Sequence, residues 1–320
     1  MTQKKYLVTG AAGFIGSTLV DRLLRDGHTV VGIDNFSTGQ RRFLEKAQPT
    51  PRFTLIEIDL LHGNIVPHFA GVDGVFHLAA NADVRFGTDA PRRDLEQNTI
   101  VTHNVLEAMR QNGVTQIGFS STGSVYGEAR QIPTPEDGPF PIQTSLYGAS
   151  KLAGEGLIAA YAEGFGFKAC IFRFVSVLGP RYTHGHVFDF VQQLKKDPAN
   201  LRVLGNGKQR KSYMHVDDCV DAILLATEKS TEKVGVFNLG CPEYCEVNDS
   251  IGWITARMGL NPQLNYTGGE RGWIGDNPFI FLDVQKILAL GWNPKYTIRQ
   301  GVEATVDFLT NNLWVYEARS

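Results

Sequence analysis

The sequence lacks the residues that a disulfide-rich or zinc-binding protein needs. Its 320 residues include only four cysteines, too few for a disulfide framework. Cys241 and Cys245 form a Cys-x3-Cys pair, but it has no paired second half for a zinc site. No His-Glu-x-x-His segment occurs either. We therefore expect buried or incidental thiols and no metal.

The sequence also has no excess of charge and no long hydrophobic run. Lys and Arg number 31, Asp and Glu number 33, and the net charge is −2, so nothing indicates binding to nucleic acid or anionic lipid. No stretch approaches the roughly 18 apolar residues of a membrane span, and the first residues lack the apolar core of a secretory signal. We expect a cytoplasmic protein that binds neither nucleic acid nor membranes.

Short apolar runs alternate with longer segments of helical period in the first half of the chain, a pattern typical of a parallel sheet covered by helices. We expect helices at about 14–26, 93–111 and 147–164. The expected strands occupy residues 6–9, 29–33, 54–58, 74–78, 116–120 and 168–173. The predicted fold class is α/β, with a doubly wound parallel Rossmann sheet and a second, smaller α/β lobe.

The pattern changes after residue 180, where longer loops and clusters of Gly, Pro and Asn follow. One strand-like stretch remains at 201–204. We interpret residues 1–179 as the dinucleotide-binding domain and residues 180–320 as a smaller substrate-binding domain. The boundary is expected to be interleaved, with part of about 205–245 returning to the larger domain.

A glycine-rich turn follows the first expected strand. Gly10, Gly13 and Gly16 form a Gly-x-x-Gly-x-x-Gly segment that opens into a helix. The missing side chains let a pyrophosphate approach the N–H groups at the helix N-terminus. Asp34 ends the second strand, where its carboxylate can accept hydrogen bonds from an adenine ribose and repel a 2′-phosphate. The pattern favours NAD over NADP as the cofactor.

Tyr147 and Lys151 are four residues apart in an expected helix, so their side chains share one face. The hydroxyl cluster from Ser120 to Thr122 follows a strand upstream. A tyrosine base working near neutral pH needs its pKa lowered by about three units, or roughly 4 kcal/mol. A lysine charge about 5 Å away contributes on the order of 3 kcal/mol. We predict that the pair is catalytic and that Lys151 lowers the pKa of Tyr147.

Further motifs run along almost the whole chain, and together with the glycine turn and the Tyr-x3-Lys pair they carry a resemblance. They are Asp34-Asn35, Asp59-Leu60, His77-Leu-Ala-Ala80, Asn98, Ser-Ser-Thr122-x-x-Val-Tyr-Gly127, Gly179-Pro180-Arg181, Gly205-Asn-Gly207, His215-Val-Asp-Asp218, Phe237-Asn-Leu-Gly240 and Gly275-Asp276. The chain resembles the extended short-chain dehydrogenase/reductases. Within them it is most similar to the NAD-dependent nucleotide-sugar epimerases and dehydratases, and above all to the UDP-galactose (UDP-glucose) 4-epimerases.

The resemblance implies two sets of binding residues. The implied NAD-binding residues are Gly10, Gly13, Phe14, Ile15, Gly16, Asp34, Asn35, Ser37, Gly39, Asp59, Leu60, Leu78, Ala79, Ala80, Asn98, Ser120, Tyr147, Lys151 and Phe174. The implied contacts to a nucleotide sugar are Thr122, Ser124, Tyr147, Ser176, Val187, Leu204, Lys211, Arg271 and Ile280.

The resemblance also implies a reaction, with Tyr147, Lys151 and Thr122 as the catalytic residues. Tyr147 would take the proton of the sugar 4-hydroxyl while C4 gives a hydride to NAD. Lys151 would hold the nicotinamide ribose, and Thr122 would hydrogen-bond O4. The transient 4-keto sugar would turn over and take the hydride back on its other face. The implied activity is 4-epimerisation of a nucleotide sugar, with UDP-glucose and UDP-galactose as the expected pair.

Several positions help to distinguish among the activities and substrates of the family's members. Gly123 and Ser124 stand where the family's 4,6-dehydratases carry Asp-Glu, and elimination of water lacks its proton carriers without those carboxylates. Ser176 resembles the Thr of uronic-acid epimerases, which leaves a UDP-glucuronate 4-epimerase as an alternative. Ile280 is smaller than the tyrosine of hexose-restricted enzymes, so we expect N-acetylhexosamines to be admitted as well.

Two cations are candidates for holding the substrate diphosphate. Lys211 stands where the family usually has an arginine, so a point charge replaces a forked guanidinium, and Arg271 is the candidate for the second contact. A 4-ketosugar reductase and, outside the enzymes, an NAD-binding sensor or scaffold remain alternatives. The resemblance further implies a homodimer that pairs through the helices near 93–111 and 147–164.

Overall fold

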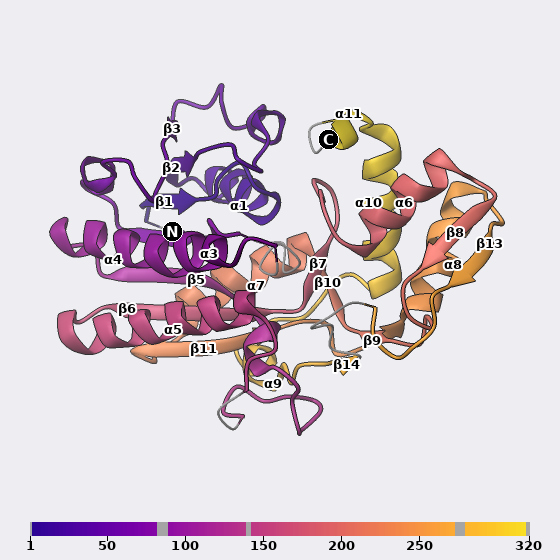
Figure 1. Ribbon diagram of the computed structural model, residues 1–320. Coiled ribbons are helices and arrows are strands. Elements are labelled where there is room, and N and C mark those ends of the chain that lie inside the picture. The colour runs from indigo at the N-terminus through magenta and orange to yellow at the C-terminus, as the bar shows by residue number, and fades with distance from the viewer. Residues whose placement is uncertain (1, 82–88, 139–141, 273–278, 318–320) are drawn as a thin grey trace. The chain divides into compact units, whose positions relative to one another are not determined.

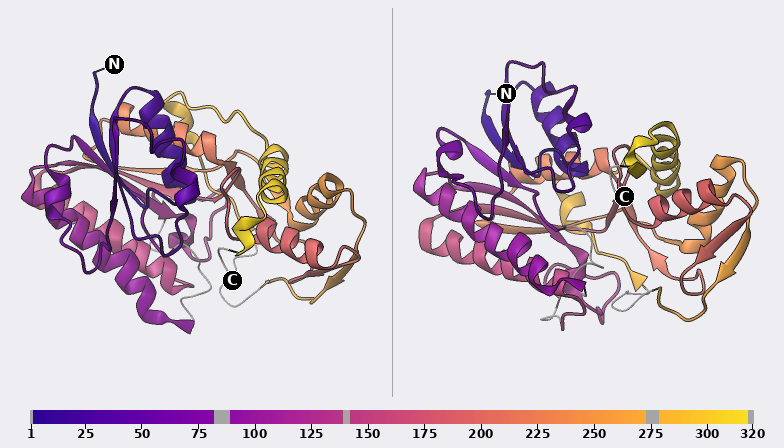
Figure 2. Two further views of the ribbon diagram at one scale, coloured as in Figure 1. Left: turned by 90° about the horizontal axis from the view of Figure 1, so that it is seen from above. Right: turned by 45° about the horizontal axis from the view of Figure 1, so that its top comes forward.

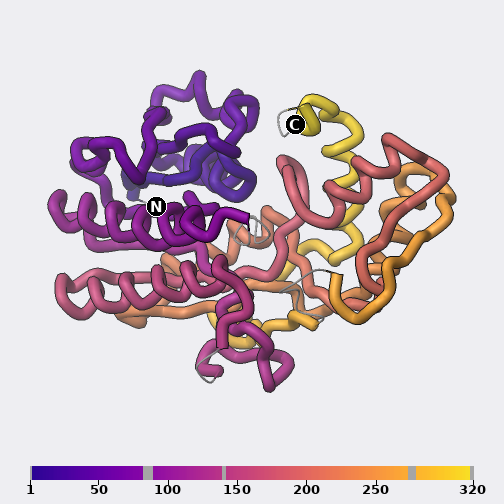
Figure 3. Tube along the Cα trace, viewed as in Figure 1, coloured from indigo at the N-terminus to yellow at the C-terminus, as the bar shows by residue number. Residues whose placement is uncertain are grey.

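The computed structural model of the chain describes residues 2–81, 89–138, 142–272 and 279–317. Internal contacts divide the chain into two compact units. Unit 1 comprises Met1–Gly127, Phe140–Phe174 and Val220–Phe237. Unit 2 comprises Glu128–Pro139, Val175–Cys219 and Asn238–Ser320. Each unit is therefore assembled from stretches that are separate in the sequence, and their colours distinguish them in Figure 3.

The described residues of unit 1 form a seven-stranded sheet with the order β11-β6-β5-β4-β1-β2-β3 (Figure 1). The strands are β1 (Lys5–Thr9), β2 (Thr29–Asp34), β3 (Phe53–Glu57), β4 (Gly74–His77), β5 (Gln116–Thr122), β6 (Lys168–Phe174) and β11 (Val234–Leu239). Neighbours from β6 to β3 pair in parallel. The strand order reverses between β1 and β4, which is the switch point of a doubly wound sheet. The predicted fold class is confirmed.

Helices cover both faces of this sheet (Figures 1 and 2). On one face, α4 (Val101–Gln111) lies beside α5 (Leu146–Phe165). On the other face, α1 (Phe14–Arg25) and α7 (Val216–Lys229) are joined by an ion pair between Arg22 and Asp221. The expected helix at 93–111 is a composite of α3 (Pro91–Asp94), the π-helix η3 (Leu95–Ile100) and α4. The 3-10 helices of this unit are η1 (Arg41–Leu44), η2 (Val66–Phe69) and η4 (Gly123–Tyr126).

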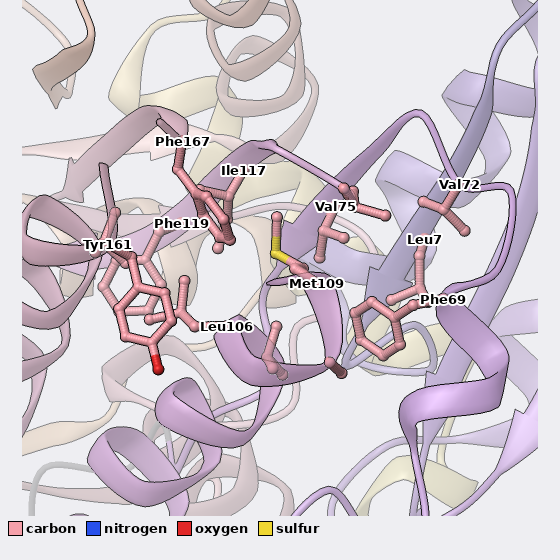
Figure 4. Close-up of a cluster of buried hydrophobic side chains, with 14 of the residues drawn as sticks. Leu7, Phe69, Val72, Val75, Leu106, Met109, Ile117, Phe119, Tyr161 and Phe167 are labelled. Atoms are coloured by element: carbon pink, nitrogen blue, oxygen red, sulfur yellow. The ribbon is translucent and has the colours of Figure 1, made fainter. Parts of the chain in front are cut away.

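An apolar core fills the space between the sheet and the α4–α5 layer (Figure 4). Strands, helices and η2 all contribute buried side chains to it, including Leu7, Phe69, Val75, Leu106, Met109, Ile117, Phe119, Tyr161 and Phe167. Burying each such side chain contributes about 1.5–3 kcal/mol. A Cβ atom on Gly154 of α5 would lie 2.9 Å from the Phe119 ring. The glycine therefore lets α5 approach the sheet closely.

His77, at the end of β4, is a buried polar side chain at the edge of this core. Its Nδ1 lies 2.7 Å from Thr9 Oγ1 and its Nε2 lies 3.1 Å from Thr102 Oγ1. Burial, and to a smaller extent the charge of Lys151, lowers the pKa of His77 to about 3. The imidazole is therefore neutral at physiological pH, with both ring nitrogens hydrogen-bonded.

Unit 2 contains short strands in small separate sheets. β7 (Ser176–Leu178) pairs with β10 (Tyr213–His215), β8 (Asn200–Val203) pairs with β13 (Gln263–Tyr266), and β9 (Arg210–Lys211) lies between β12 (Cys245–Glu246) and β14 (Phe279–Ile280). The helices are α6 (His186–Lys196), α8 (Val247–Met258), α9 (Gln285–Ala289), α10 (Ile298–Asn311) and α11 (Trp314–Glu317). Helices α6, α8 and α10 pack together. The strand-like stretch expected at 201–204 corresponds to β8.

The four cysteines, Cys170, Cys219, Cys241 and Cys245, are buried, and none of them is joined in a disulfide. Burial raises the pKa of the Cys241 and Cys245 thiols to about 12, so both are protonated at neutral pH. Across the described ranges, none of the helices combines the length and the apolar character that crossing a membrane requires.

We predict that His77 makes the protein sensitive to acid. Its folded-state pKa near 3 lies below the usual 6.5, so between these values the unfolded chain binds a proton that the folded chain does not. Stability is therefore lost as pH falls through this window. From pH 7 to pH 5 the free energy of unfolding in urea should fall by about 2 kcal/mol more in the parent than in His77→Gln.

The exposed His62 provides the control for this measurement. His62→Gln should lose as much stability as the parent between the two pH values. Equal losses in His77→Gln and the parent would show that the buried imidazole does not govern the acid response.

Candidate active site

The glycine turn connects β1 to α1. Gly10 adopts the left-handed conformation with φ of +68°, and a Cβ atom on Gly16 would lie 2.0 Å from the carbonyl oxygen of Gly10. Gly13 is the N-cap residue of α1 and, because it has no side chain, makes no capping hydrogen bond. The turn thus packs backbone against backbone at a helix N-terminus, which is an arrangement that binds anions.

Three predicted cofactor contacts, Leu78, Ala79 and Ala80, follow β4 beside this turn. Thr9 Oγ1 accepts hydrogen bonds from the N–H groups of Leu78 and Ala79, each at 3.2 Å. A Cβ atom on Gly10 would lie 2.8 Å from the Ala79 nitrogen. The ends of β1 and β4 therefore meet at the switch point, where doubly wound sheets bind ligands.

Asp34 ends β2, and its carboxylate is held by the backbone of two neighbouring segments. Oδ2 accepts a hydrogen bond from the N–H of Ala12 at 2.9 Å, and Oδ1 accepts one from Phe36 at 2.8 Å. Burial raises the pKa of Asp34, while these hydrogen bonds lower it. A Cβ atom on Gly39 would lie 2.7 Å from Oδ1, so the missing side chain of Gly39 leaves room for this carboxylate. Its remaining lone pairs can accept ribose hydroxyls.

The other predicted contacts near Asp34 link the ends of β2 and β3. Asn35 Nδ2 donates to Asp59 Oδ2 at 3.0 Å, and Asn35 Oδ1 accepts from the Ser37 N–H at 3.0 Å. Asp59 Oδ1 accepts from the Leu61 N–H at 2.6 Å. Leu60 is buried in the core of unit 1. The structure therefore gathers the predicted adenosine contacts at one edge of the sheet.

Lys151 is almost wholly buried on the second turn of α5. The N-terminus of α5 is capped by Ser145 Oγ, which accepts from the Gly148 N–H at 3.0 Å. The Lys151 side chain is 1% exposed. Its Nζ donates to the carbonyl oxygen of Ser120 at 2.8 Å and lies 4.9 Å from the centre of the Phe119 ring.

Burial dominates the protonation of Tyr147 and Lys151. It lowers the pKa of Lys151 to about 7, although the charges of Glu155 and Asp94 raise it. It raises the pKa of Tyr147 to about 12, although a hydrogen bond with Thr122 lowers it. The prediction that Lys151 lowers the pKa of Tyr147 is wrong for this structure, because burial outweighs other effects and the ammonium is directed to a backbone carbonyl.

Thr122 and Ser124 lie beside Tyr147 at the end of β5. Thr122 Oγ1 accepts from the Ser124 N–H at 3.1 Å and donates to Ser124 Oγ at 3.2 Å. The same residue lowers the pKa of the Tyr147 phenol. Phe174 is paired with Thr122 across β5 and β6. The predicted hydroxyl cluster and the predicted base are therefore brought together.

Asn98 joins η3 to the start of α5. Its Oδ1 accepts from the Asn81 N–H at 2.9 Å, and its Nδ2 donates to Ser150 Oγ at 2.9 Å. Ser150 Oγ in turn donates to the Tyr147 carbonyl at 2.9 Å. π-Helical turns such as η3 are frequent at functional sites.

The other predicted substrate contacts belong to unit 2. Lys211 and Ile280 are direct partners in the pairing of β9 with β14. Ser176 lies in β7, Val187 is buried in the first turn of α6, and Leu204 is exposed after β8. The structure thus brings Lys211 and Ile280 together within this unit.

Arg271 forms an ion pair with Glu128, a residue of the same unit. Both side chains are about half exposed, at 48% and 55%. A diphosphate contact by Arg271 therefore has to compete with a carboxylate. The predicted motif Gly275-Asp276 lies outside the described residues.

Sequence reasoning missed a buried ion pair under α5. Glu155 accepts from Arg173 Nε at 3.0 Å and from Arg173 Nη2 at 2.7 Å, and Arg173 Nη1 donates to the Tyr126 hydroxyl at 2.7 Å. Ser121 Oγ also donates to Glu155. The signal that could have revealed Glu155 is its i, i+4 spacing from Lys151, which places both on one helix face.

Known proteins match this chain along most of its length. The model of the NAD dependent epimerase/dehydratase family matches residues 6–240. The UDP-glucose 4-epimerase of Mycolicibacterium smegmatis is 32% identical over 311 residues, which cover 95% of this chain and 98% of the relative. A crystal structure of UDP-galactose 4-epimerase is 38% identical with a TM-score of 0.87, covering 97% of this chain and 100% of that chain.

A further solved structure is similar at lower identity. The UDP-glucuronic acid 4-epimerase of Bacillus cereus, in complex with UDP-glucuronic acid and NAD, has a TM-score of 0.88 and 29% identity. The match covers 96% of this chain and 99% of that chain.

We predict that Gly16→Ala lowers the free energy of unfolding by about 2–4 kcal/mol, because its Cβ would overlap the Gly10 carbonyl and force the backbone to move. The matched control is Gly252→Ala in α8, where nothing lies within 4 Å of the added Cβ. This change should raise the free energy of unfolding by about 1 kcal/mol through better helix propensity. Equal effects of the two substitutions in urea unfolding would contradict the close approach of Gly16 to the Gly10 carbonyl.

Proposed function

This chain belongs to the NAD dependent epimerase/dehydratase family and is an NAD-dependent nucleotide-sugar 4-epimerase, and we propose that it interconverts UDP-glucose and UDP-galactose. One observation carries the proposal. Thr122, at the carboxyl end of β5, lowers the pKa of the Tyr147 phenol, and Lys151 is buried one helical turn away from Tyr147. The relatives named UDP-glucose and UDP-galactose 4-epimerases match at least 95% of this chain and support the choice of sugar.

NAD is the cofactor, and the residues of unit 1 fit it. The turn around Gly13 offers an uncapped helix N-terminus that suits a pyrophosphate. The Asp34 carboxylate is fixed where it suits an unphosphorylated adenosine ribose. Added Cβ atoms at Gly10 or Gly16 would alter this cradle. We propose that Asp59 lies near the adenine and that Lys151 holds the nicotinamide ribose.

Tyr147 is the proposed acid and base of the reaction. It takes the proton of the sugar 4-hydroxyl while Thr122 hydrogen-bonds O4. When bound, NAD supplies the acceptor and later the donor of the hydride, together with a positive charge in its oxidised form. After the 4-keto sugar has presented its other face, Tyr147 returns the proton to O4. The cycle consumes neither protons nor electrons, so the product differs from the substrate only at C4.

This role requires the pKa of Tyr147 to fall from about 12 toward neutrality when the site is loaded. The change amounts to roughly 7 kcal/mol in favour of the phenolate. Within the chain, Thr122 lowers the pKa of Tyr147. The charges of the bound ligands have to supply the remaining stabilisation of the phenolate.

A dehydratase is disfavoured at the same site. The positions that would hold the required acid and base are Gly123 and Ser124, which form the first half of η4. Neither residue can carry the proton that elimination of water needs. Thr122 caps this turn, so the hydroxyls of the turn serve to hold the sugar.

Unit 2 supplies the proposed contacts to the rest of the substrate. Lys211 and Ile280 are cross-strand partners, so the cation that we propose for the diphosphate lies next to an apolar side chain. A tyrosine at position 280 would fill more space near the substituent at C2 of the sugar. We therefore propose that N-acetylhexosamines are accepted as well.

UDP-glucuronate is the second candidate substrate. Ser176 resembles the residue that uronic-acid epimerases carry at this position, and the Bacillus cereus UDP-glucuronic acid 4-epimerase is similar over nearly the whole chain. Both observations favour a site that tolerates a carboxylate at C5.

We also propose a homodimer in the cytoplasm. Large apolar side chains are exposed on η3 and at both ends of α5, namely Leu95, Ile100, Leu146 and Phe165. These side chains would be covered where η3 and α5 of one subunit pack against the same helices of a second subunit. The buried free thiols are compatible with a reducing compartment. A mass of 35.3 kDa in light scattering, that of one chain, would contradict the dimer.

Replacing Tyr147 with Phe should lower epimerisation of UDP-glucose by about a thousandfold or more, because the proton of O4 loses its acceptor. Retained NAD, measured by chromatography of the nucleotide released on denaturation, should be close to that of the parent. Tyr161→Phe is the control, since Tyr161 lies on the same helix but hydrogen-bonds Glu107.

Three outcomes would contradict this picture. Normal turnover by Tyr147→Phe would remove the mechanism. A parent protein without retained NAD would favour the 4-ketosugar reductase. A parent that binds NAD and turns over none of the UDP-sugars would favour the sensor or scaffold.

The substrate prediction is tested with UDP-glucose, UDP-galactose, their N-acetylamino forms and UDP-glucuronate. We expect turnover of the first four. Ile280→Tyr should lower the ratio of kcat/KM for UDP-N-acetylglucosamine to that for UDP-glucose about tenfold or more, through loss of space. Phe279→Tyr, whose side chain points to the other face of β14, should keep the ratio. Absent turnover of the N-acetylamino forms would remove the wider specificity, and turnover of UDP-glucuronate alone would favour the second candidate.

A further inference from the structure

Asp94 is a buried carboxylate near the active site to which the mechanism above gives no role. It ends α3, directly before η3, and is 1% exposed. Its Oδ1 accepts hydrogen bonds from Asn81 Nδ2 at 2.8 Å and from Asn98 Nδ2 at 3.3 Å. Its Oδ2 has no hydrogen-bond partner among the described residues. A carboxylate held only by neutral amides is costly to bury unless an opposite charge is near.

Two opposite charges act on Asp94, those of Arg93 and Lys151. Burial raises the pKa of Asp94, while the hydrogen bond from Asn81, the charge of the exposed Arg93 and the charge of Lys151 lower it. In return, the charge of Asp94 raises the pKa of Lys151. The two side chains are therefore close enough to interact, although no direct hydrogen bond joins them in the described structure.

The other ionisable groups around Lys151 are already balanced. Glu155, on the same helix, is held by Arg173 through hydrogen bonds of 2.7 and 3.0 Å. His77, on β4, is neutral because burial lowers its pKa to about 3. On β5 the ammonium meets a backbone carbonyl and an aromatic ring. Asp94 therefore adds to the negative charge that Glu155 provides near Lys151.

A chain of hydrogen bonds also connects Asp94 to the backbone of Tyr147. Asn98 Nδ2 donates to both Asp94 Oδ1 and Ser150 Oγ, and Ser150 Oγ donates to the Tyr147 carbonyl at 2.9 Å. Thr99 Oγ1 donates to the Ser150 carbonyl at 3.1 Å. Asp94 and η3 therefore hold the first turn of α5.

We propose that Asp94 is a positioning residue of this active site: its carboxylate keeps the Lys151 ammonium charged and, through Asn98 and Ser150, orients the turn that carries Tyr147. Its significance for catalysis rests on the proposed function. The electrostatic role itself does not require turnover.

The same charge acts in the opposite sense on the base. Asp94 raises the pKa of Tyr147 and so disfavours the phenolate, while it favours the charged form of Lys151. The remaining group that faces the phenol, the Thr122 hydroxyl on β5, is uncharged. Removing the charge of Asp94 should therefore shift the titrations of both Tyr147 and Lys151 to lower pH.

The experiment follows the phenol directly by its near-ultraviolet absorption as a phenolate. A pH titration of the NAD-bound protein, minus that of its Tyr147→Phe form, isolates Tyr147. We expect Asp94→Asn, compared in the same way with the double variant Asp94→Asn/Tyr147→Phe, to lower the midpoint by about one pH unit. The acid limb of kcat against pH should shift in the same direction.

Glu96→Gln is the matched control. It removes a carboxylate from the same helical segment, where Glu96 pairs with Arg92 at the surface, and should leave the midpoint unchanged. Asp94→Ser removes the charge with a smaller side chain and serves if Asp94→Asn does not fold. An unshifted midpoint in a folded Asp94 variant overturns the proposal, because a purely structural role would lower turnover without moving the titration.

The experiment distinguishes the role of Asp94 from the proposed function. A shifted midpoint in a protein that epimerises no UDP-sugar supports the role of Asp94 and overturns the proposed function. An unshifted midpoint in an active epimerase overturns the role of Asp94 and leaves the proposed function in place.

Discussion

The burial of one ammonium group is the constraint on which the active-site side of unit 1 depends. Lys151 is 1% exposed, and a buried cation persists only with hydrogen-bond acceptors and opposite charges around it. The Ser120 carbonyl accepts its hydrogen bond, and Glu155 and Asp94 supply negative charge. Glu155 in turn needs Arg173 on β6. The sheet edge, α5 and η3 are thereby joined into one polar cluster above the apolar core.

Much of unit 1 can be predicted because its signals are local. Alternating apolar runs place the first six strands of the sheet within one or two residues of their observed bounds. The turn at Gly10 and the acidic end of β2 at Asp34 follow from short motifs, and helical spacing puts Tyr147 and Lys151 on one face. Protonation cannot be predicted in this way. The direction of the Tyr147 pKa shift depends on burial, which only the assembled fold determines.

The features that cannot be predicted from the sequence depend on contacts between distant parts of the chain. Arg173 with Glu155, and Arg271 with Glu128, join residues of types that usually lie at the surface, so no pattern in the sequence identifies the pairs. The interaction that we propose between Asp94 and Lys151 also joins residues of two separate helices. The strands of unit 2 are as short as two residues, too short for a periodic pattern. The sequence therefore predicts which residue types form the site, but not how its charged groups are protonated and paired.

The interleaved assembly of unit 1 has a consequence for biosynthesis. Strand β11 pairs with β6, yet the chain between Phe174 and Val234 must leave the ribosome first. At typical elongation rates this takes on the order of several seconds. Until then β6 is an edge strand with unpaired backbone groups, which invites pairing with another nascent chain. Completion of the sheet therefore depends on the timing of translation, and chaperones that cover β6 would protect the incomplete domain.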